Sequence, residues 1–112
     1  MPTDAEMAAY AQQLPSIYRD IMAAFPQIEP HRKAGYGLAF QTLAMHFANT
    51  GRGWVLGDVQ QACKQLADNG FIEIKNGIFA HPTSVGEQLI AAVTGKPLAP
   101  DKQVPQLPAQ PW

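Results

Sequence analysis

The clearest pattern of apolar and polar positions lies between residues 58 and 93. From Asp58 to Asp68, apolar residues recur every three or four positions, which predicts an amphipathic helix with one buried stripe. Asn69 and Gly70 follow this run, and glycine is the residue that adopts the left-handed conformation at a helix end most readily. The pattern therefore predicts a helix over residues 57–69 with one polar face.

A β-hairpin is predicted directly after this helix. Residues 71–75 are rich in strand-forming side chains, and residues 78–81 can return beside them in the antiparallel direction. Between them stand Asn76 and Gly77, a pair that favours a two-residue type I′ turn because both central residues of that turn have positive φ.

Capping residues and prolines set the limits of the first two predicted helices. A Thr-x-x-Glu capping box starts a helix over residues 4–13. Pro15 interrupts the chain there, because proline removes a helical hydrogen bond. A second helix is predicted over residues 16–25, with Pro26 as its end.

Three further elements complete the prediction. A third helix is expected over residues 34–48, and a short extended piece that enters the next helix over residues 54–56. After the hairpin, Thr83 or Ser84 caps a last helix that runs to Val93.

This order of elements resembles the second half of a winged-helix domain, in which a recognition helix precedes a two-stranded wing and a closing helix. The resemblance covers roughly residues 16–94 and rests on the hairpin and on two motifs, Leu66-x-x-x-Gly70-Phe71-Ile72 and Thr83-x-x-Gly86-x-x-Leu89-Ile90. It implies a mainly α fold with a small antiparallel β-hairpin, built as a winged-helix-like three-helix core with an added N-terminal and C-terminal helix. It indicates no single family. The alternative is an unrelated α+β domain that contains a helix, a hairpin and a helix.

The composition is that of an ordered chain with a single main domain. The 112 residues are 46% hydrophobic and 15% charged, which is enough apolar material for a core without disulfides. Residues 1–15 are expected to form a separate N-terminal helix, and residues 16–95 the winged-helix domain. Residues 96–112 contain five prolines and little apolar periodicity, so a disordered tail is expected there.

The charge gives no global reason to expect a nucleic-acid or membrane partner, since the formal net charge is −1. Between residues 31 and 77, however, five cations stand against three anions, a local net charge of +2. Positive charge is therefore mildly concentrated in the part of the chain that a winged helix would turn toward DNA.

The resemblance makes a small DNA-binding protein, a transcriptional regulator or accessory factor, the leading expectation. Glutamine can pair with an adenine edge in the major groove, and lysine can reach guanine or phosphate. On the helix of residues 57–69 the candidate base-reading residues are Gln60, Gln61, Lys64 and Gln65. The candidate phosphate contacts, from loops and wing, are Arg32, Lys33, Arg52 and Lys75. Because the wing turn is short and carries one lysine, we expect modest affinity for DNA.

The competing expectation is a winged helix that serves as a protein-interaction or adaptor module, which the near-neutral charge would fit. The N-terminal helix is small or apolar over much of its surface, so it either mediates a homodimer or packs on its own domain. Pro105, Pro108 and Pro111 follow the three-residue period of polyproline II, so the tail is either a docking segment for a protein partner or a solvated tail.

The sequence gives no sign of an enzyme, a metal site or a cofactor. His31, His46 and His81 stand far apart, and none is four residues from another metal-binding side chain. Cys63, the single cysteine, lies on the apolar stripe of its helix, where an inert buried thiol is expected. The N-terminal residues lack the pattern of a secretory signal, and the apolar segments are too short to span a bilayer, so a cytoplasmic location without membrane contact is expected.

Overall fold

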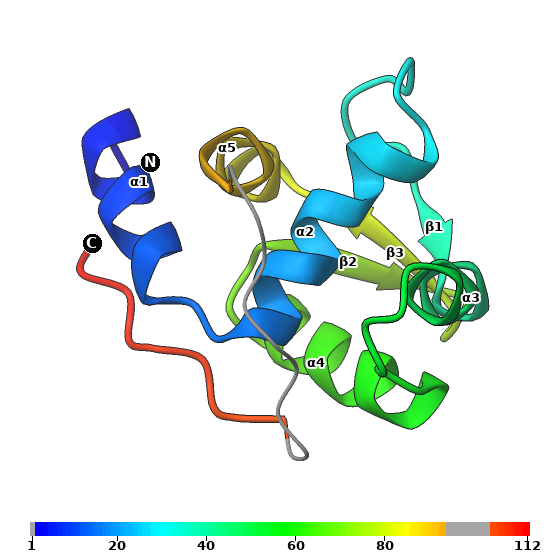
Figure 1. The fold of residues 1–112 in the computed structure, drawn as a ribbon. Helices are drawn as coiled ribbons and strands as arrows, with labels where there is room; N and C mark the ends of the chain where they lie inside the picture. Colours follow the sequence, from blue (N-terminus) through cyan, green and yellow to red (C-terminus); the bar gives the residue numbers. More distant parts are fainter. Residues whose placement is uncertain (1, 94–103) are drawn as a thin grey trace.

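Within residues 2–93 and 104–112, which the computed structural model describes, the chain forms five helices and a small three-stranded sheet (Figure 1). In chain order these are α1 (Asp4–Gln13), α2 (Ser16–Ile28), β1 (Leu38–Ala39), α3 (Phe40–Asn49), α4 (Leu56–Asp68), β2 (Ile72–Lys75), β3 (Phe79–Pro82) and α5 (Ser84–Ala92). The α+β class predicted from the sequence is confirmed. Of the helices in this described part of the chain, none combines the length and the apolarity that crossing a bilayer requires.

The sheet has the order β1-β3-β2, with β3 antiparallel to both neighbours. The predicted hairpin turn is confirmed: Asn76 and Gly77 have φ values of 56° and 70°. The N–H of Ile78 closes the turn on the carbonyl of Lys75 over 3.2 Å. This turn sets the register of the hairpin, because a two-residue loop fixes which residues face each other across the strands.

Helix α2 lies at the centre of the molecule and contacts α3, α4 and α5 (Figure 1). Its apolar stripe is fully buried, and α3, α4 and α5 pack against it. The main contributors to this core are Ile17, Ile21 and Phe25 from α2, Leu43 and Phe47 from α3, Val59, Ala62, Cys63 and Leu66 from α4, and Phe71, Ala80 and Leu89. The 3.6-residue period of α4 that the sequence displays is thus the period of its buried stripe.

The start of α5 explains the Thr83-x-x-Gly86 motif. Thr83 caps the helix: its Oγ1 accepts from the N–H of Gly86 over 3.1 Å and donates to the carbonyl of Gly70 over 2.6 Å. A Cβ built on Gly86 would stand 1.8 Å from the carbonyl oxygen of Phe71. The cap and the missing side chain together hold α5 against the chain that leaves α4.

The region before α3 differs from the sequence prediction. The predicted helix over residues 34–48 begins only at Phe40, because Gly35 has a φ of 81° and the next residues pair with β3 as strand β1. The extended piece expected at residues 54–56 is observed at Val55, whereas Leu56 already begins α4, and the strand that pairs with the hairpin is β1. Trp54 instead turns inward and donates its Nε1–H to Asp20 Oδ2 over 2.7 Å.

The end of α2 also differs. The helix passes Pro26, where the sequence predicted its end, and continues to Ile28. A proline in the last turn removes one helical hydrogen bond, while the N–H of Glu29 still reaches the carbonyl of Phe25 over 3.0 Å. The loss of this one hydrogen bond is therefore not enough to end the helix at Pro26.

Residues 104–112, which we call the docked segment, pack against the domain, contrary to the disorder expected for the tail. Leu107 is buried, and the segment runs past α4 toward α1 (Figure 1). Two tyrosine hydroxyls from α1 and α2 donate to its proline carbonyls. These partners are distant in the sequence, so the local composition did not reveal them. The remainder of the predicted tail, residues 96–103, lies outside the described residues.

Candidate functional site

Helix α4 presents a polar face beside the hairpin. The helix begins where the N–H of Val55 donates to Asp58 Oδ2 over 3.1 Å, which satisfies one of the free N–H groups at its first turn. Because the apolar stripe of α4 faces the core, three of the four predicted base-reading side chains are exposed: Gln60, Gln61 and Lys64. The structure therefore brings these three residues together on one surface.

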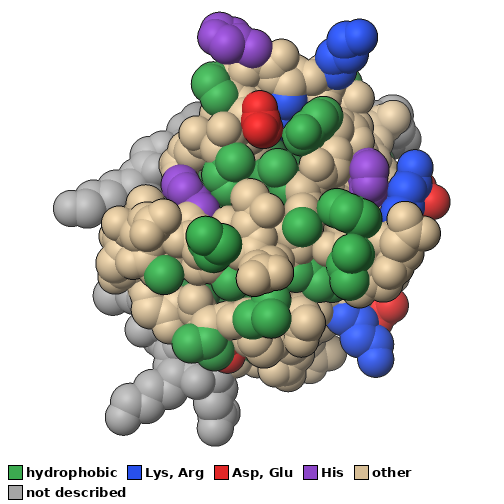
Figure 2. All heavy atoms as spheres, turned by 90° about the vertical axis from the view of Figure 1, so that its right-hand side faces the viewer, with side chains coloured by type: hydrophobic (Ala, Val, Ile, Leu, Met, Phe, Trp, Pro, Cys, Tyr) green, Lys and Arg blue, Asp and Glu red, His purple; other side chains and the backbone are tan. Residues whose placement is uncertain are grey.

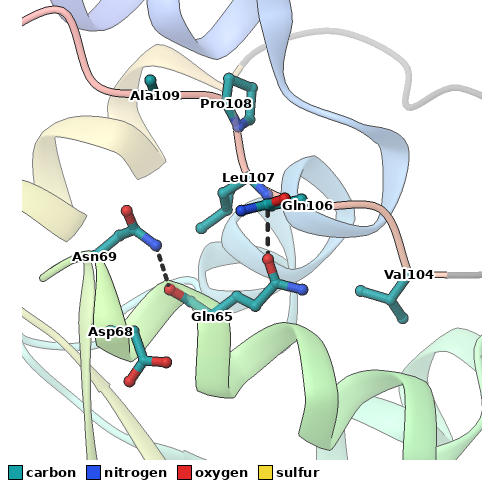
Figure 3. A pocket seen from close by; sticks show the side chains of 8 residues that line it. All are labelled: Gln65, Asp68, Asn69, Val104, Gln106, Leu107, Pro108 and Ala109. Carbon is teal, nitrogen blue, oxygen red and sulfur yellow. Dashed lines mark hydrogen bonds between the residues drawn. The ribbon is translucent and has the colours of Figure 1, made fainter.

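Gln65, the fourth predicted base-reading residue, is not on this exposed surface. Its side chain is half-buried, and its Oε1 accepts from the backbone N–H of Leu107 over 3.1 Å (Figure 3). Asp68 and Asn69 line an open hollow between this end of α4 and the docked segment (Figure 3). The second half of α4 is thus partly covered by the chain itself.

Arg32 binds a carboxylate within the domain. Its Nη1 donates to Glu87 Oε2 over 3.0 Å and its Nη2 to Oε1, and its guanidinium lies over the ring of Phe25. Partial burial would raise the pKa of Glu87, but hydrogen bonds from Arg32 and from the N–H of Gly35, with the charge of Arg32, outweigh it and lower that pKa. This pair fastens the loop before β1 to α5.

Arg52 is also engaged inside the domain. Its Nε donates to Asp20 Oδ2 over 3.2 Å, and the same oxygen accepts from Trp54. Asp20 is 3% exposed, so this is a buried carboxylate with an arginine and an indole as donors. The sequence reasoning missed Asp20, although a carboxylate on the same helix stripe as Ile17 and Ala24 is a signal of a buried acid.

The remaining two predicted phosphate contacts are exposed. Lys33 lies in the loop before β1, and Lys75 ends β2. Lys64 and Lys75 supply exposed positive charge on α4 and the hairpin, whereas Lys33 lies beside β3, in a pocket that Phe79 and His81 also line. Glu73 and Asp68 are exposed in the same part of the chain, so the charge of this side is mixed.

Large apolar side chains are exposed next to the polar face of α4. Val55, Leu56 and Ile78 are 63%, 41% and 52% exposed, and we call these three residues the apolar patch. A small pocket opens beside them, lined by Ala39, Phe40, Gln41, Leu56, Gln60 and Ile78. Figure 2 shows apolar side chains gathered over the side of the molecule that carries α3 and β1, with many of the charged groups at its margins.

Cys63 is a buried core residue with an unreactive thiol. Burial raises the pKa of its thiol to about 12, so the thiolate that reacts or binds metals is scarce at neutral pH. Within residues 2–93 and 104–112, no three side chains of His, Cys, Asp or Glu gather in a way that could hold a metal ion.

Comparison with models of protein families, with curated proteins and with solved structures finds no match to this chain.

Proposed function

We propose that this chain is a winged-helix protein-interaction module whose contact surface is the apolar patch. The winged-helix assignment is supported by the element order α2, β1, α3, α4, β2, β3 and by the pairing of a short first strand with the hairpin. In that arrangement α4 corresponds to the recognition helix and the β2–β3 hairpin to the wing.

The observation that carries this proposal is the exposure of Val55, Leu56 and Ile78 at the start of α4 and the tip of the hairpin. A winged helix that reads DNA needs cations here, because phosphate contacts supply most of the affinity. Exposed apolar side chains beside a small pocket instead favour a protein surface that inserts an apolar side chain. Hydrogen-bonding groups such as Gln41 and Gln60 at the pocket provide a polar rim.

The engagement of two arginines within the domain argues in the same direction. Arg32 and Arg52 were half of the candidate phosphate contacts, and each is bound to a carboxylate of its own domain. Turning either toward a phosphate would leave a partly or fully buried carboxylate without its arginine, which is costly. Few phosphate contacts then remain for a chain of net charge −1.

Photo-crosslinking tests the proposal. A photoreactive amino acid at position 78, in cells that express the chain, is expected to give a discrete protein adduct that survives nuclease treatment. Leu56→Asp abolishes that adduct, because a charge enters the apolar patch, whereas the same probe at exposed Gln12 of α1 gives none. A nuclease-sensitive adduct at position 78, or one that Leu56→Asp leaves unchanged, contradicts the proposal.

DNA binding is a second candidate, favoured by the exposure of Gln60, Gln61 and Lys64 on one face of α4. If the chain binds DNA, it is expected to bind random duplex DNA at low salt, and its affinity is expected to fall steeply as salt is added. This candidate also requires further weakening by Lys64→Ala with Lys75→Ala, two exposed lysines whose loss leaves the internal ion pairs intact. Absence of binding at micromolar protein in low salt excludes this candidate.

A further inference from the structure

The docked segment is held by hydrogen bonds suited to a proline-rich chain. The hydroxyl of Tyr10 donates a hydrogen bond to the carbonyl of Pro108 over 2.9 Å, and the hydroxyl of Tyr18 donates one to the carbonyl of Pro105. Proline has a carbonyl acceptor but no N–H donor, so a proline-rich chain offers acceptors that its own backbone leaves unused. Residues three apart lie on one side of a polyproline II helix. Pro105 and Pro108 have this spacing, and the carbonyls of both accept from tyrosine hydroxyls of the domain.

Burial keeps these two hydroxyls in the donor form. It raises the pKa of Tyr18 to about 12, with a further contribution from neighbouring Tyr10, and it raises the pKa of Tyr10 as well. Both side chains therefore remain protonated far above neutral pH. Both rings are buried in the core, where that of Tyr10 also stacks on Phe71.

A second side of the segment faces α4. Leu107 is 8% exposed and gives its backbone N–H to Gln65 Oε1, while Gln110 Nε2 donates to the carbonyl of Asn69 over 2.8 Å. Both contacts are made by the second half of α4 and the residue that ends it, so the segment is held by α4 as well as by the two tyrosines. Figure 3 shows Leu107 and Pro108 above Gln65, with the open hollow beside them.

An aromatic site receives the last residue of the segment. The ring of Trp112 lies edge-on to Tyr10, with centroids 5.2 Å apart, and edge-on to Phe71 at 6.5 Å. Trp112 is still 38% exposed, so this contact is not sealed within the core. Aromatic rings with hydroxyl donors are the usual surface on which proline-rich segments bind.

We propose that the groove formed by α1, α2 and α4 is a binding site for a proline-rich segment of a partner protein with the spacing Pro-x-Leu-Pro, and that the docked segment is its replaceable internal occupant. Residues 105–108 are the copy of this pattern within the chain. The groove lies on a different surface from the apolar patch, so this inference goes beyond the proposed function and does not rest on it.

A partner segment fits this groove better than the segment of a second copy. The segment of a second copy has the same sequence as the chain's own segment. It must therefore compete with an identical segment whose tether gives it an effective concentration of about millimolar. A partner can add contacts in the open hollow, where Asp68 and Asn69 face small Ala109. Such added contacts let a different segment displace the tethered one.

A labelled peptide with the sequence of residues 104–112 tests the site on the full chain by fluorescence anisotropy. Leu107→Asp in the chain places a charge in a buried apolar position and releases the chain's own segment. We expect this variant to bind the peptide at least about tenfold more tightly than the native chain does, because the native groove is already filled. An unfolding curve of each variant verifies that it is folded.

Removing the hydroxyl donors tests the proposed chemistry. Tyr10→Phe with Tyr18→Phe, added to Leu107→Asp, keeps both rings and is expected to weaken peptide binding roughly 5- to 30-fold, the value of two hydrogen bonds. Gln61→Ala, on the exposed face of α4, leaves binding unchanged. A peptide that carries Leu107→Asp does not bind.

Any one of three results overturns the proposal. The native-sequence peptide does not bind saturably to the folded Leu107→Asp chain, or it binds this chain and the native chain with equal affinity. The third is that the tyrosine substitutions leave its affinity unchanged. If Leu107→Asp fails to fold, Gln110→Ala with Trp112→Ala replaces it, since both side chains are at least partly exposed. Light scattering on the native chain adds a further check. If the native chain is a dimer and Leu107→Asp makes it monomeric, the groove binds the segment of a second copy, and the partner assignment is overturned.

Discussion

At the scale of single residues, two glycines in helices have opposite surroundings. Gly86 is buried in α5, where a Cβ would collide with the carbonyl of Phe71. Gly57 is exposed in the first turn of α4, and a Cβ there would meet no atom within 4 Å. The same substitution is therefore expected to have opposite effects at the two positions.

Gly86→Ala is expected to lower the free energy of unfolding by roughly 1–3 kcal/mol or more, because the backbone of α5 must move away from Phe71. Gly57→Ala is the matched control and is expected to raise it by up to about 1 kcal/mol, since alanine is the better helix former. Urea unfolding followed by circular dichroism measures both. Equal changes in the two variants would contradict the close packing described for α5.

At the scale of elements, the Arg32–Glu87 pair joins the loop before β1 to α5. The pKa of Glu87 is lowered in the folded chain, so its charge stabilises the fold above the ordinary value of 4.5. That contribution is lost as the pH falls through the still lower pKa of the folded state.

Glu87→Gln is expected to destabilise the chain at pH 7 by roughly 1–3 kcal/mol, since Arg32 and Gly35 lose a charged acceptor. The difference from the native chain is expected to shrink as the pH falls below 4.5, where the native carboxylate becomes protonated. Thermal unfolding between pH 3 and 7 measures it. Glu73→Gln, on exposed β2, is the control and is expected to change stability by less than about 0.5 kcal/mol. A pH-independent deficit in Glu87→Gln would refute the ion-pair account.

Which elements the sequence could predict depends on where their signals lie. The capping box of α1, the period of α4 and the Asn-Gly turn are local, so these elements were predicted close to their observed bounds. Strand β1 has two residues and exists through pairing with β3, some forty positions further along the chain, so no local pattern identified it. Local composition also gave no sign of the docked segment's partners.

The same distinction applies to the candidate site. Helical periodicity was enough to place Gln60, Gln61 and Lys64 on an exposed face. It was not enough for Arg32 and Arg52, because their carboxylate partners are 55 and 32 residues away in the sequence. Charge that looked available for phosphates is in fact used inside the fold.

At the scale of the whole molecule, the core is continuous from α2 through α4 to the sheet and α5. Cys63 lies within it, fully buried, with a pKa raised to about 12. Its reagent accessibility therefore reports on opening of the entire domain rather than on local motion.

A thiol reagent at pH 8 is expected to modify Cys63 in the native chain at least about 1000-fold more slowly than in denaturant, because modification must await unfolding. Mass spectrometry over time measures the rate. Gln61→Cys, on the exposed face of α4, is the positive control and is expected to react at the rate of a free thiol. Rapid labelling of Cys63 in the folded chain would contradict its position in the core.

The order of the sheet also bears on how the chain behaves at high concentration. Open strand edges are templates for aggregation, because their unpaired backbone groups accept a strand from a neighbouring molecule. One edge here, β1, is two residues long, and the opposite edge, β2, carries the exposed charges of Glu73 and Lys75. Crowded solutions of this protein are therefore expected to resist fibril growth from the sheet.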